Sequence, residues 1–287
     1  MQAGFHLWNY SVPGPTALLP AIIAQTARRA EDGGFAQFTV MDHWFQMDRV
    51  APASQPMLEA FTTLAFVAAN TTRMRLGPLV AGVTYRHPAL LVKTATTLDL
   101  LSGGRSMFGI GAAWYEREHL GLGVPYPRIS ERFERLEETL RIAEQMWGDD
   151  DGAFDGVHYR LAETMGEPKP TSRPHPPIMI GGRGEKKTLR LAAQYAQIVN
   201  LTASDPEDVK HLLEVLEAHC DRLGTDYAVI EKTVIAARDP FADDFIPAMA
   251  ELAELGVTMV VLRVNPPDPV GSVTRLADEV LPALAQL

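Results

Sequence analysis

The sequence predicts one α/β domain over residues 1–287, a (β/α)8 TIM barrel with insertions after its fourth strand and before its fifth. Two observations lead to this prediction. Short apolar runs alternate with amphipathic helical patterns eight times along the chain. No shift in composition marks a domain boundary, and α/β barrels of ~200–250 residues or more commonly form one domain.

Eight short apolar runs are predicted to be the barrel strands. They are Ala3–Leu7, Gln37–Met41, Arg75–Val80, Ser106–Ile110, Pro177–Ile180, Gln197–Asn200, Val229–Ala236 and Val257–Val264. A helical pattern follows each of them. The predicted helices are Leu18–Ala30, Met57–Ala69, Ala89–Leu101, Glu131–Trp147, Lys186–Ala196, Asp208–Leu223, Ile246–Leu255 and Val273–Leu284.

The helix predicted over Asp208–Leu223 shows the pattern most clearly. It opens after Ser204-Asp205-Pro206, which supplies a cap and a proline in the first turn. Its apolar face consists of Val209, Leu212, Leu213, Leu216, Cys220 and Leu223. Cys220 is therefore predicted to be a core residue. As the single cysteine it excludes an internal disulfide and a cysteine-based zinc site.

Two connections are too long to be simple loops. Residues 112–130 follow the fourth predicted strand, so we expect them to lie over the active face of the barrel. Residues 148–176 precede the fifth strand and should lie at the bottom or flank. Within them, Asp-Gly between apolar residues at Phe154–Val157 predicts a small hairpin.

Composition excludes several classes of partner. The chain has 26 basic and 36 acidic residues, a net charge of −10. Nucleic acids and anionic membranes are bound by surfaces rich in Lys and Arg, so neither is an expected partner. Met1–Trp8 lacks the features of a signal peptide, and no apolar run approaches the ~18–20 residues of a membrane span. We therefore expect a soluble, cytoplasmic protein.

A glycine-rich turn after the fifth predicted strand has the features of an anion site. The strand runs into Gly181, Gly182 and Gly184 and then directly into a helix, with Arg183 and Lys186 adding positive charge. Glycines let the backbone approach an anion, and a helix N-terminus offers free N–H groups. The turn is predicted to bind phosphate. The alternative is a glycine turn without a ligand.

His43 is the candidate catalytic residue. It follows Asp42 at the end of the second predicted strand, where barrel enzymes place their functional groups. A histidine there can act as an acid or base, or donate a hydrogen bond to a ring. The alternative is a structural His–Asp contact. Asp42 itself is expected to hold nearby backbone.

Aromatic residues gather at the predicted strand ends. They are Trp8, Tyr10, Trp44, Phe45, Tyr85, Trp114 and Tyr115. Such a group favours a flat organic ligand over a bare metal. The sixth and eighth strands add Asn200 and Arg263 at their ends. No metal site is predicted, because H-E-x-x-H and H-x-H are absent, and G-x-S-x-G for a serine nucleophile is absent too.

Six stretches of the chain resemble the luciferase-like monooxygenase superfamily, and more closely its branch that uses the deazaflavin coenzyme F420. They are V-M-D-H-W-F-Q (Val40–Gln46), V-A-G-V-T-Y-R-H-P-A-L-L-V-K (Val80–Lys93), T-L-D-L-L-S-G-G-R (Thr97–Arg105), G-I-G-A-A-W-Y-E-R-E-H (Gly109–His119), R-F-E-R-L-E-E-T-L (Arg132–Leu140) and P-I-M-I-G-G-R-G-E-K-K-T-L-R (Pro177–Arg190). The last third of the chain resembles the family only in pattern.

The resemblance implies a cofactor site in the barrel mouth. The ring is expected against a bulge after the third strand, with a cis peptide at Gly82–Val83, and the tail phosphate at Gly181–Gly184. His43 is expected to face the reactive carbon of the ring. The residues implied in cofactor binding are Asp42, Gly82, Val83, Thr84, Gly111, Ala112, Tyr115, Gly181, Gly182, Arg183 and Gly184.

The activity implied is hydride transfer between coenzyme F420 and a small organic substrate, with His43 steadying charge or moving a proton. Sugar-phosphate dehydrogenases of this branch carry a glutamate where this chain has Ala112, so sugar-phosphate oxidation is not expected. Tyr115 and Glu116 are the candidate replacements. Two alternatives remain: an FMN-dependent monooxygenase, and a flavin-binding barrel without catalysis.

Two predicted helices are apolar nearly all round, Met57–Ala69 and Ala89–Leu101. Monomers rarely expose contiguous apolar patches of more than a few hundred Å². A homodimer through these helices is therefore predicted, as two-fold dimers are the commonest assemblies and luciferase-like proteins commonly pair this way. The alternative is that residues 148–176 cover both helices.

Overall fold

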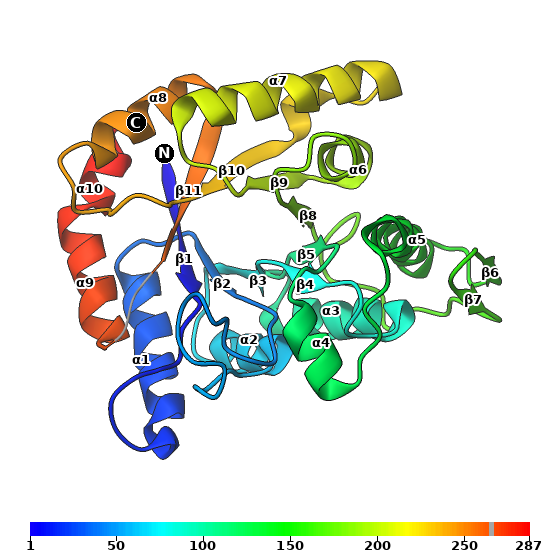
Figure 1. Cartoon of the computed structure of the whole chain (residues 1–287), viewed down its shortest axis with the longest axis horizontal. Coiled ribbons are helices and arrows are strands. Elements are labelled where there is room, and N and C mark those ends of the chain that lie inside the picture. The colour runs from blue at the N-terminus through cyan, green and yellow to red at the C-terminus, as the bar shows by residue number, and fades with distance from the viewer. Residues whose placement is uncertain (264–266) are drawn as a thin grey trace.

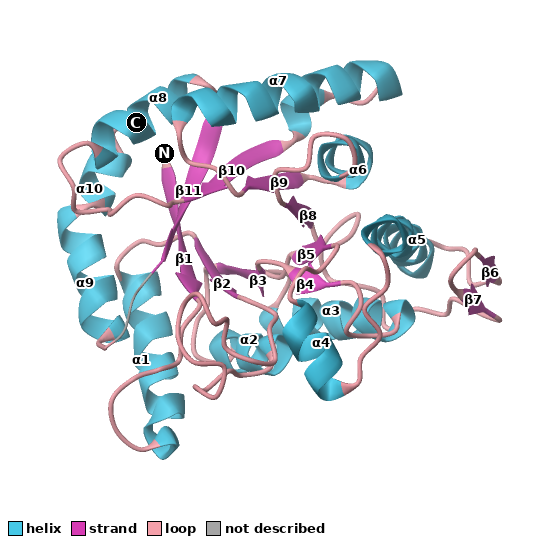
Figure 2. Cartoon of the chain, viewed as in Figure 1, coloured by secondary structure: helices cyan, strands magenta, loops and turns pink. Residues whose placement is uncertain are grey.

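A computed structural model describes residues 1–263 and 267–287. Nine parallel strands form one sheet in the order β3-β2-β1-β11-β10-β9-β8-β5-β4. A bridge between Leu76 and Ser106 links β3 to the segment that leads into β5, which closes the ring. Figure 1 shows helices around the outside, and Figure 2 shows the strands enclosed by them. The predicted (β/α)8 barrel is confirmed.

The barrel strands match the predicted segments closely. They are β1 (Gln2–Leu7), β2 (Gln37–Val40), β3 (Arg75–Pro78), β4 (Ala81–Gly82), β5 (Phe108–Gly111), β8 (Ile178–Gly181), β9 (Ile198–Leu201), β10 (Glu231–Ile235) and β11 (Val257–Arg263). The predicted end of the last strand, Val264, lies outside the described residues.

The helices also follow the predicted order. They are α1 (Leu19–Asp32), α2 (Ala60–Ala68), α3 (Pro88–Ser102), α4 (Glu116–Leu122), α5 (Ile129–Trp147), α6 (Thr188–Tyr195), α7 (Pro206–Leu223), α8 (Phe245–Glu254), α9 (Pro269–Glu279) and α10 (Leu281–Leu284). Helix α4 was not predicted, and the last predicted helix is divided into α9 and α10. No helix among the described residues is long and apolar enough to span a membrane.

The third barrel strand is broken into β3 and β4. Its cis peptide lies at Leu79–Val80, so the expectation of a cis bond at Gly82–Val83 is wrong. The reason is that the residues at Gly82 are already part of a paired strand. Beyond the break, Ala81 and Gly82 already pair with Ile110 and Gly111, and the Val83 amide donates to the Gly111 carbonyl at 3.0 Å. The irregular segment therefore precedes Gly82 and does not follow it.

Val80 explains the glycines of the neighbouring strands. A Cβ at Gly111 would lie 2.8 Å from Val80 Cγ2, and a Cβ at Gly181 would lie 2.9 Å from Val80 Cγ1. Side chains at both positions would collide with Val80, since non-bonded carbons approach to ~3.5–4 Å. The Val80 side chain thus rests on two glycine-bearing strands, β5 and β8.

The L-S-G-G-R motif after α3 is structural. Gly103 and Gly104 have φ values of +70° and +85°, a region that favours glycine. The turn delivers the Arg105 guanidinium to the carbonyl oxygens of Ala68, Thr71 and Met74 at 3.0–3.1 Å. Arg105 thereby joins the end of α2 to the start of β3.

The two long connections lie where they were expected. Residues 112–130 contain α4, and Ala112, Ala113, Trp114 and Ile129 of this segment line the cavity at the carboxyl ends of the strands. Residues 148–176 carry the predicted hairpin, β6 (Phe154–Asp155) against β7 (Arg160–Leu161), beside α5. The carboxylate of Glu138 on α5 accepts hydrogen bonds from the amides of Val157 and Tyr159 in that hairpin. The prediction that Cys220 belongs to the core is also confirmed, because it is fully buried.

Candidate active site at the carboxyl ends of the strands

A cavity of about 700 Å³ lies at the carboxyl ends of the barrel strands. Its volume is within the ~300–1,000 Å³ range of small-molecule sites. Every barrel strand, or the residues directly after it, contributes to the lining. Those residues include His6 and Trp8, Asp42 and His43, Val80 and Gly82, Gly111 and Ala112, Gly181 and Gly182, Asn200, Ile235 and Arg263.

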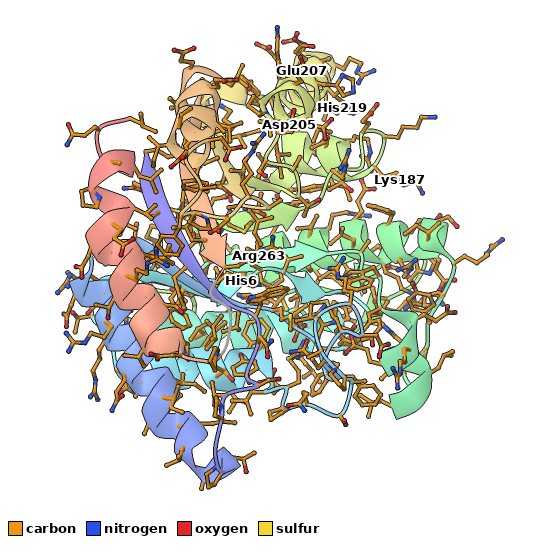
Figure 3. All side chains as sticks on the ribbon, turned by 60° about the vertical axis from the view of Figure 1, so that its left-hand side comes forward. His6, Lys187, Asp205, Glu207, His219 and Arg263 are labelled. Atoms are coloured by element: carbon orange, nitrogen blue, oxygen red, sulfur yellow. The ribbon has the colours of Figure 1, made fainter. Side chains whose placement is uncertain are left out.

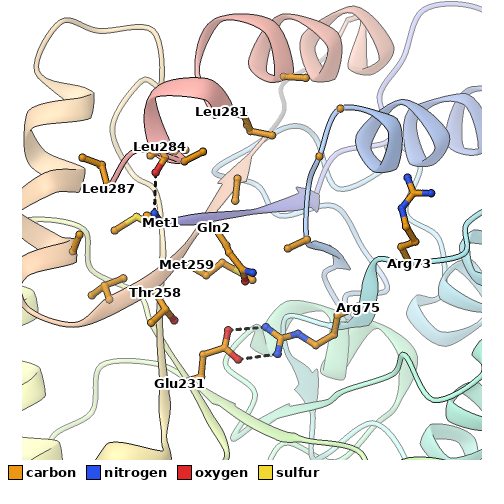
Figure 4. Close-up of a pocket in the computed structure, with 18 of the residues that line it drawn as sticks. Met1, Gln2, Arg73, Arg75, Glu231, Thr258, Met259, Leu281, Leu284 and Leu287 are labelled. Carbon is orange, nitrogen blue, oxygen red and sulfur yellow. Dashed lines mark hydrogen bonds and ion pairs between the residues drawn. The ribbon is translucent and has the colours of Figure 1, made fainter.

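A larger cavity of about 1250 Å³ lies at the opposite end of the barrel (Figure 4). Two of its charged residues pair with each other, and its amino-terminal group binds a carbonyl. Arg75 donates to both carboxylate oxygens of Glu231 at 2.7 and 2.8 Å, and the amino group of Met1 donates to the Leu284 carbonyl at 2.8 Å. Barrel enzymes carry their chemistry at the other end. We therefore assign the smaller cavity as the candidate active site.

His43 is held at the cavity wall by Glu118 of α4. The distance from His43 Nδ1 to Glu118 Oε1 is 2.7 Å, and the Glu118 side chain is fully buried while that of His43 is 11% exposed. The rings of Trp114 and Tyr115 contact His43 edge-on, with centroids 5.4 and 5.7 Å away. A carboxylate only accepts hydrogen bonds, so Nδ1 carries the proton. His43 Nε2 is the nitrogen left for the cavity.

Glu118 collects four donors. Besides His43, the Tyr85 hydroxyl donates to Oε1, and the amides of Trp44 and Phe45 donate to Oε2 at 2.6 and 3.0 Å. Burial alone raises the pKa of Glu118, but the hydrogen bonds from His43, Tyr85 and Phe45 outweigh it and hold that pKa below its ordinary value. Glu118 is therefore a buried carboxylate that fixes the His43 loop.

Asp42 has a structural role, as expected. Its carboxylate accepts from the Gly82 amide at 3.1 Å and from both terminal nitrogens of Arg86 at 2.7 and 2.9 Å. Arg86 also pairs with Glu59. The alternative of a His43–Asp42 contact does not occur. Asp42 instead anchors the backbone of β4, where the ring is expected to rest.

His119 supports the same wall from behind. Its Nδ1 lies 2.8 Å from the Tyr115 carbonyl oxygen and must donate to it, so Nε2 accepts from the Thr84 hydroxyl at 2.6 Å. Burial lowers the pKa of His119, which favours this neutral form. The His119 ring stacks on Tyr85 with centroids 4.5 Å apart. Tyr85, which lines the cavity, and Thr84 behind it are thereby fixed in place.

His6 lies on the cavity floor. Thr39 Oγ1 donates to the Phe5 carbonyl at 3.1 Å and therefore accepts from His6 Nδ1 at 2.9 Å. Burial, and secondarily the charge of Arg263, lower the pKa of His6 to about 3. His6 is thus neutral at physiological pH, and its Nε2 is an acceptor.

The predicted anion turn is divided between cavity and surface. Gly181 and Gly182 line the cavity, and Gly182 has a φ of +142° that favours glycine. A Cβ at Gly184 would lie 2.7 Å from Thr188 Oγ1, at the start of α6. Arg183 is exposed, with Nη2 3.7 Å from Asp208 Oδ2. It lies outside the cavity lining.

The remaining candidates are similarly divided. Gly82, Gly111 and Ala112 line the cavity, whereas Val83 is buried behind it. Tyr115 donates to Asp48 Oδ2 at 2.9 Å and is nearly buried. Of the aromatic group, Trp8, Tyr85 and Trp114 line the cavity, and Tyr10, Trp44, Phe45 and Tyr115 lie outside the lining.

Sequence reasoning missed Glu118, Arg49 and His6. Of the residues near Ala112, it considered Tyr115 and Glu116 as candidate proton donors, but Glu116 is exposed on the first turn of α4 and Glu118 is buried. Glu118 lies in a helix of seven residues, which is too short to show the apolar periodicity that would mark its buried face. His6 could have been found, because it is a polar residue inside an otherwise apolar predicted strand.

The lining fits a planar polar ring. On one side the wall is formed by Val80 together with Gly82, Gly111, Gly181 and Gly182. The glycines leave room for Val80, because a Cβ at Gly111 or Gly181 would collide with its side chain. Asn200 Oδ1 is buried without a hydrogen-bond partner, while Asn200 Nδ2 donates to Thr233 at 2.9 Å. Buried acceptors normally have a hydrogen-bond donor, which a ligand or a water would supply here. In the described residues, no group of three or more His, Cys, Asp or Glu side chains is placed to hold a metal ion.

Comparison with known proteins gives a family match. A family model described as luciferase-like monooxygenase matches residues 5–254. An uncharacterised protein of Mycobacterium tuberculosis is 31% identical over 253 residues, covering 83% of this chain and 85% of that protein.

Two curated relatives differ in cofactor. An F420-dependent glucose-6-phosphate dehydrogenase of Kineococcus radiotolerans is 34% identical over 176 residues, 58% of this chain and 49% of that protein. An FMNH2-dependent dimethylsulfone monooxygenase of Pseudomonas putida is 29% identical over 168 residues, 58% of this chain and 45% of that protein. The matches thus span about half the length of these two relatives.

The fold is shared with a solved structure. The coenzyme F420-dependent tetrahydromethanopterin reductase of Methanopyrus kandleri superposes with a TM-score of 0.78 at 18% identity. The superposition covers 99% of this chain and 100% of the reductase chain.

Proposed function

Because the chain belongs to the luciferase-like monooxygenase family, we propose that it is an oxidoreductase that transfers a hydride between coenzyme F420 and a small organic substrate. Support for F420 comes from the dehydrogenase of Kineococcus radiotolerans, which is 34% identical to this chain over 176 residues. The motifs from Val40 to Arg190 point the same way.

One observation carries the proposal: the pair of His43 and Glu118. Glu118 fixes the imidazole so that one nitrogen faces the cavity, and it stabilises the positive charge that forms if that nitrogen takes up a proton. A second wall is formed by Gly82 and Gly111 with the Val80 side chain beside them. This arrangement suits an acid–base group beside a planar cofactor.

The residues that would hold the deazaflavin are those of the glycine wall. Gly82, Gly111, Ala112, Gly181 and Gly182 would contact the ring and ribityl chain, with Val80 beneath them. The loop with Arg183 and Gly184 would meet the phosphate, as glycine-rich turns before helices do. The bound deazaflavin supplies hydride transfer at its central ring carbon. Asp42 keeps the β4 backbone in place, and His43 moves or holds a proton.

A second candidate function is favoured by one observation. The relative from Pseudomonas putida is FMNH2-dependent, and its match covers 58% of this chain, the same share as that of the F420-dependent dehydrogenase. An FMN-dependent monooxygenase is therefore the alternative function. A barrel that binds a flavin without catalysis is the remaining one, and the paired His43 and Glu118 argue against it.

Turnover tests the catalytic part of the proposal. Purified protein is mixed with reduced F420 and a panel of small enones, imines and ketones, and the return of oxidised F420 is followed by its fluorescence. We expect oxidation that depends on both protein and acceptor. Acceptor-dependent oxidation of reduced FMN, with none of reduced F420, would replace this function by the alternative. No acceptor-dependent oxidation of either cofactor would favour the catalytically silent barrel.

The proposal includes a cytoplasmic homodimer that binds neither nucleic acid nor membrane. Residues 148–176 cover only part of α3, through Ser172 Oγ at 2.7 Å from Asp99 and through Lys93, which donates to the Glu167 carbonyl. The side chains of Phe66, Leu90 and Leu101 stay exposed. A second copy packed on α2 and α3 would cover them.

A further inference from the structure

Two arginines face the cavity without a carboxylate. Arg263 ends β11, and Arg49 lies in the loop after β2; both line the cavity. Arg263 Nε and Nη2 both donate to the Ala236 carbonyl, at 3.1 and 2.9 Å. Arg49 Nη2 contacts the sulfur of Met47 at 3.7 Å. In residues 1–263 and 267–287, neither guanidinium forms an ion pair with Asp or Glu.

Each of these guanidinium groups lies over a tryptophan ring. The Arg263 carbon Cζ is 4.9 Å from the centroid of Trp8, and that of Arg49 is 4.7 Å from the centroid of Trp114. Cation–π contacts of this kind fix the direction of a guanidinium while leaving its edge for hydrogen bonds. Burial lowers the pKa of Arg263, and the positive charge of Arg49 lowers it further. The two guanidinium groups are therefore close enough to repel each other.

Among the described residues that line the cavity, Asp42 is the only carboxylate. Asp42 is already bound to Arg86, and His6, which pairs in register with Arg263 across β1 and β11, is uncharged (Figure 3). The chain as a whole carries a net charge of −10. Two unpaired arginines in the mouth of an acidic protein therefore concentrate positive potential at one spot.

Of the two arginines, Arg263 is the one remote from Gly111, whereas Arg49 lies over Trp114, three residues after Gly111. Around the ring of strands, β11 is four places from β5, so Arg263 stands across the barrel from Gly111. A ring held against Gly111 leaves the Arg263 side of the cavity for the substrate. His43, at the end of β2, lies between them along the ring of strands.

We propose that Arg263 and Arg49 bind an anionic group of the substrate, a carboxylate or a phosphate. As an assignment of substrate class this rests on the proposed function. Guanidinium groups recognise both anions through paired N–H donors, and these charge-assisted bonds are stronger than neutral ones. The substrate is thus a small organic acid whose reacting carbon lies toward His43.

Binding of simple probes tests the proposal. Benzoate and inorganic phosphate, with neutral benzamide as the matched probe, are titrated into the full chain and followed by calorimetry and by emission of Trp8 and Trp114. Variants Arg263→Met and Arg49→Met are compared with Arg29→Met, an exposed arginine on α1. We expect either anion to bind the unmodified protein and Arg29→Met, with at least tenfold weaker binding to the two cavity variants. Benzamide should not bind measurably.

Titration with F420, and with its riboside that lacks the phosphate tail, separates substrate from cofactor. We expect Arg263→Met to keep the affinity for both within about threefold. Loss of F420 binding without loss of riboside binding would assign the arginines to the cofactor tail and overturn the proposal. Equal anion binding by all variants, or none by the unmodified protein, would also overturn it. Anion binding that needs Arg263, in a protein that does not bind F420, would refute the proposed function and leave the anion site standing.

Discussion

The Nδ1 atom of His43 lies 2.7 Å from the buried carboxylate of Glu118, which is 75 residues away in the chain. Glu118 also accepts the Tyr85 hydroxyl and two loop amides, so one carboxylate fixes the His43 ring and the backbone after it. A positioned histidine is thereby presented to a cavity that Val80, Gly82, Gly111, Gly181 and Gly182 also line.

Replacing His43 tests its role as acid or base. His43→Ala should lower turnover roughly 10²–10⁴-fold and leave cofactor affinity nearly intact, because a positioned proton donor or acceptor acts mainly in the transition state. Steady-state rates and F420 titration measure the two effects. A loss of affinity with unchanged turnover would make His43 a binding or packing residue.

Acid stability reports on Glu118. Its pKa is lower in the folded protein than the ordinary 4.5, so its contribution to the free energy of unfolding is present above pH 4.5 and is lost as the pH falls below it. Glu118→Gln should be less stable at pH 7 and should lose less stability below pH 4.5. Glu116→Gln, on the exposed face of the same helix, is the matched control and should follow the unmodified protein. If the free energy of unfolding fell with pH in the same way for all three proteins, this role of Glu118 would be contradicted.

A second pH effect comes from His6. Its pKa is about 3 in the folded protein against 6.5 ordinarily, so the unfolded chain binds the proton first. Stability should therefore fall as the pH drops from 6.5 toward 3, by about 1.4 kcal/mol per pH unit from this group. Urea unfolding at pH 7 and pH 5 measures it. His6→Gln should remove that part of the slope, and an unchanged slope would show that His6 is charged in the folded state.

Assembly is tested on α2. Phe66 is 40% exposed there, and Phe66→Glu should convert a dimer to monomers because a carboxylate in an apolar interface is costly to desolvate. Sedimentation equilibrium at micromolar concentration measures the mass. Val157→Glu, at a residue 85% exposed in the β6–β7 hairpin, is the control and should stay dimeric. A monomeric mass for the unmodified protein would refute the dimer.

The barrel could be predicted because its signals are local. Apolar periodicity within 4 to 17 residues is enough to mark a strand or a helix, and the Asp-Gly of the β6–β7 hairpin marks a turn. The break at Leu79–Val80 could not be placed, because it is decided by which residues pair with Gly111 and by the packing of Val80 on β5 and β8.

The site was only partly predictable for the same reason. His43 and the glycines stand at strand ends, where the barrel rule directs attention. Glu118 becomes important only when α4 folds back over β2, and the pairing of Arg86 with Asp42 spans 44 residues. Such contacts depend on tertiary structure, and no spacing in the sequence encodes them.

The central claim is that this cavity binds a deazaflavin. Equilibrium titration of the purified protein with F420 and with FMN, each oxidised and reduced, tests it most directly, with Ala112→Phe as a variant that fills part of the cavity. The account predicts micromolar or tighter binding of F420, at least tenfold weaker binding of FMN, and loss of F420 binding in Ala112→Phe. Micromolar binding of FMN without binding of F420 would contradict it.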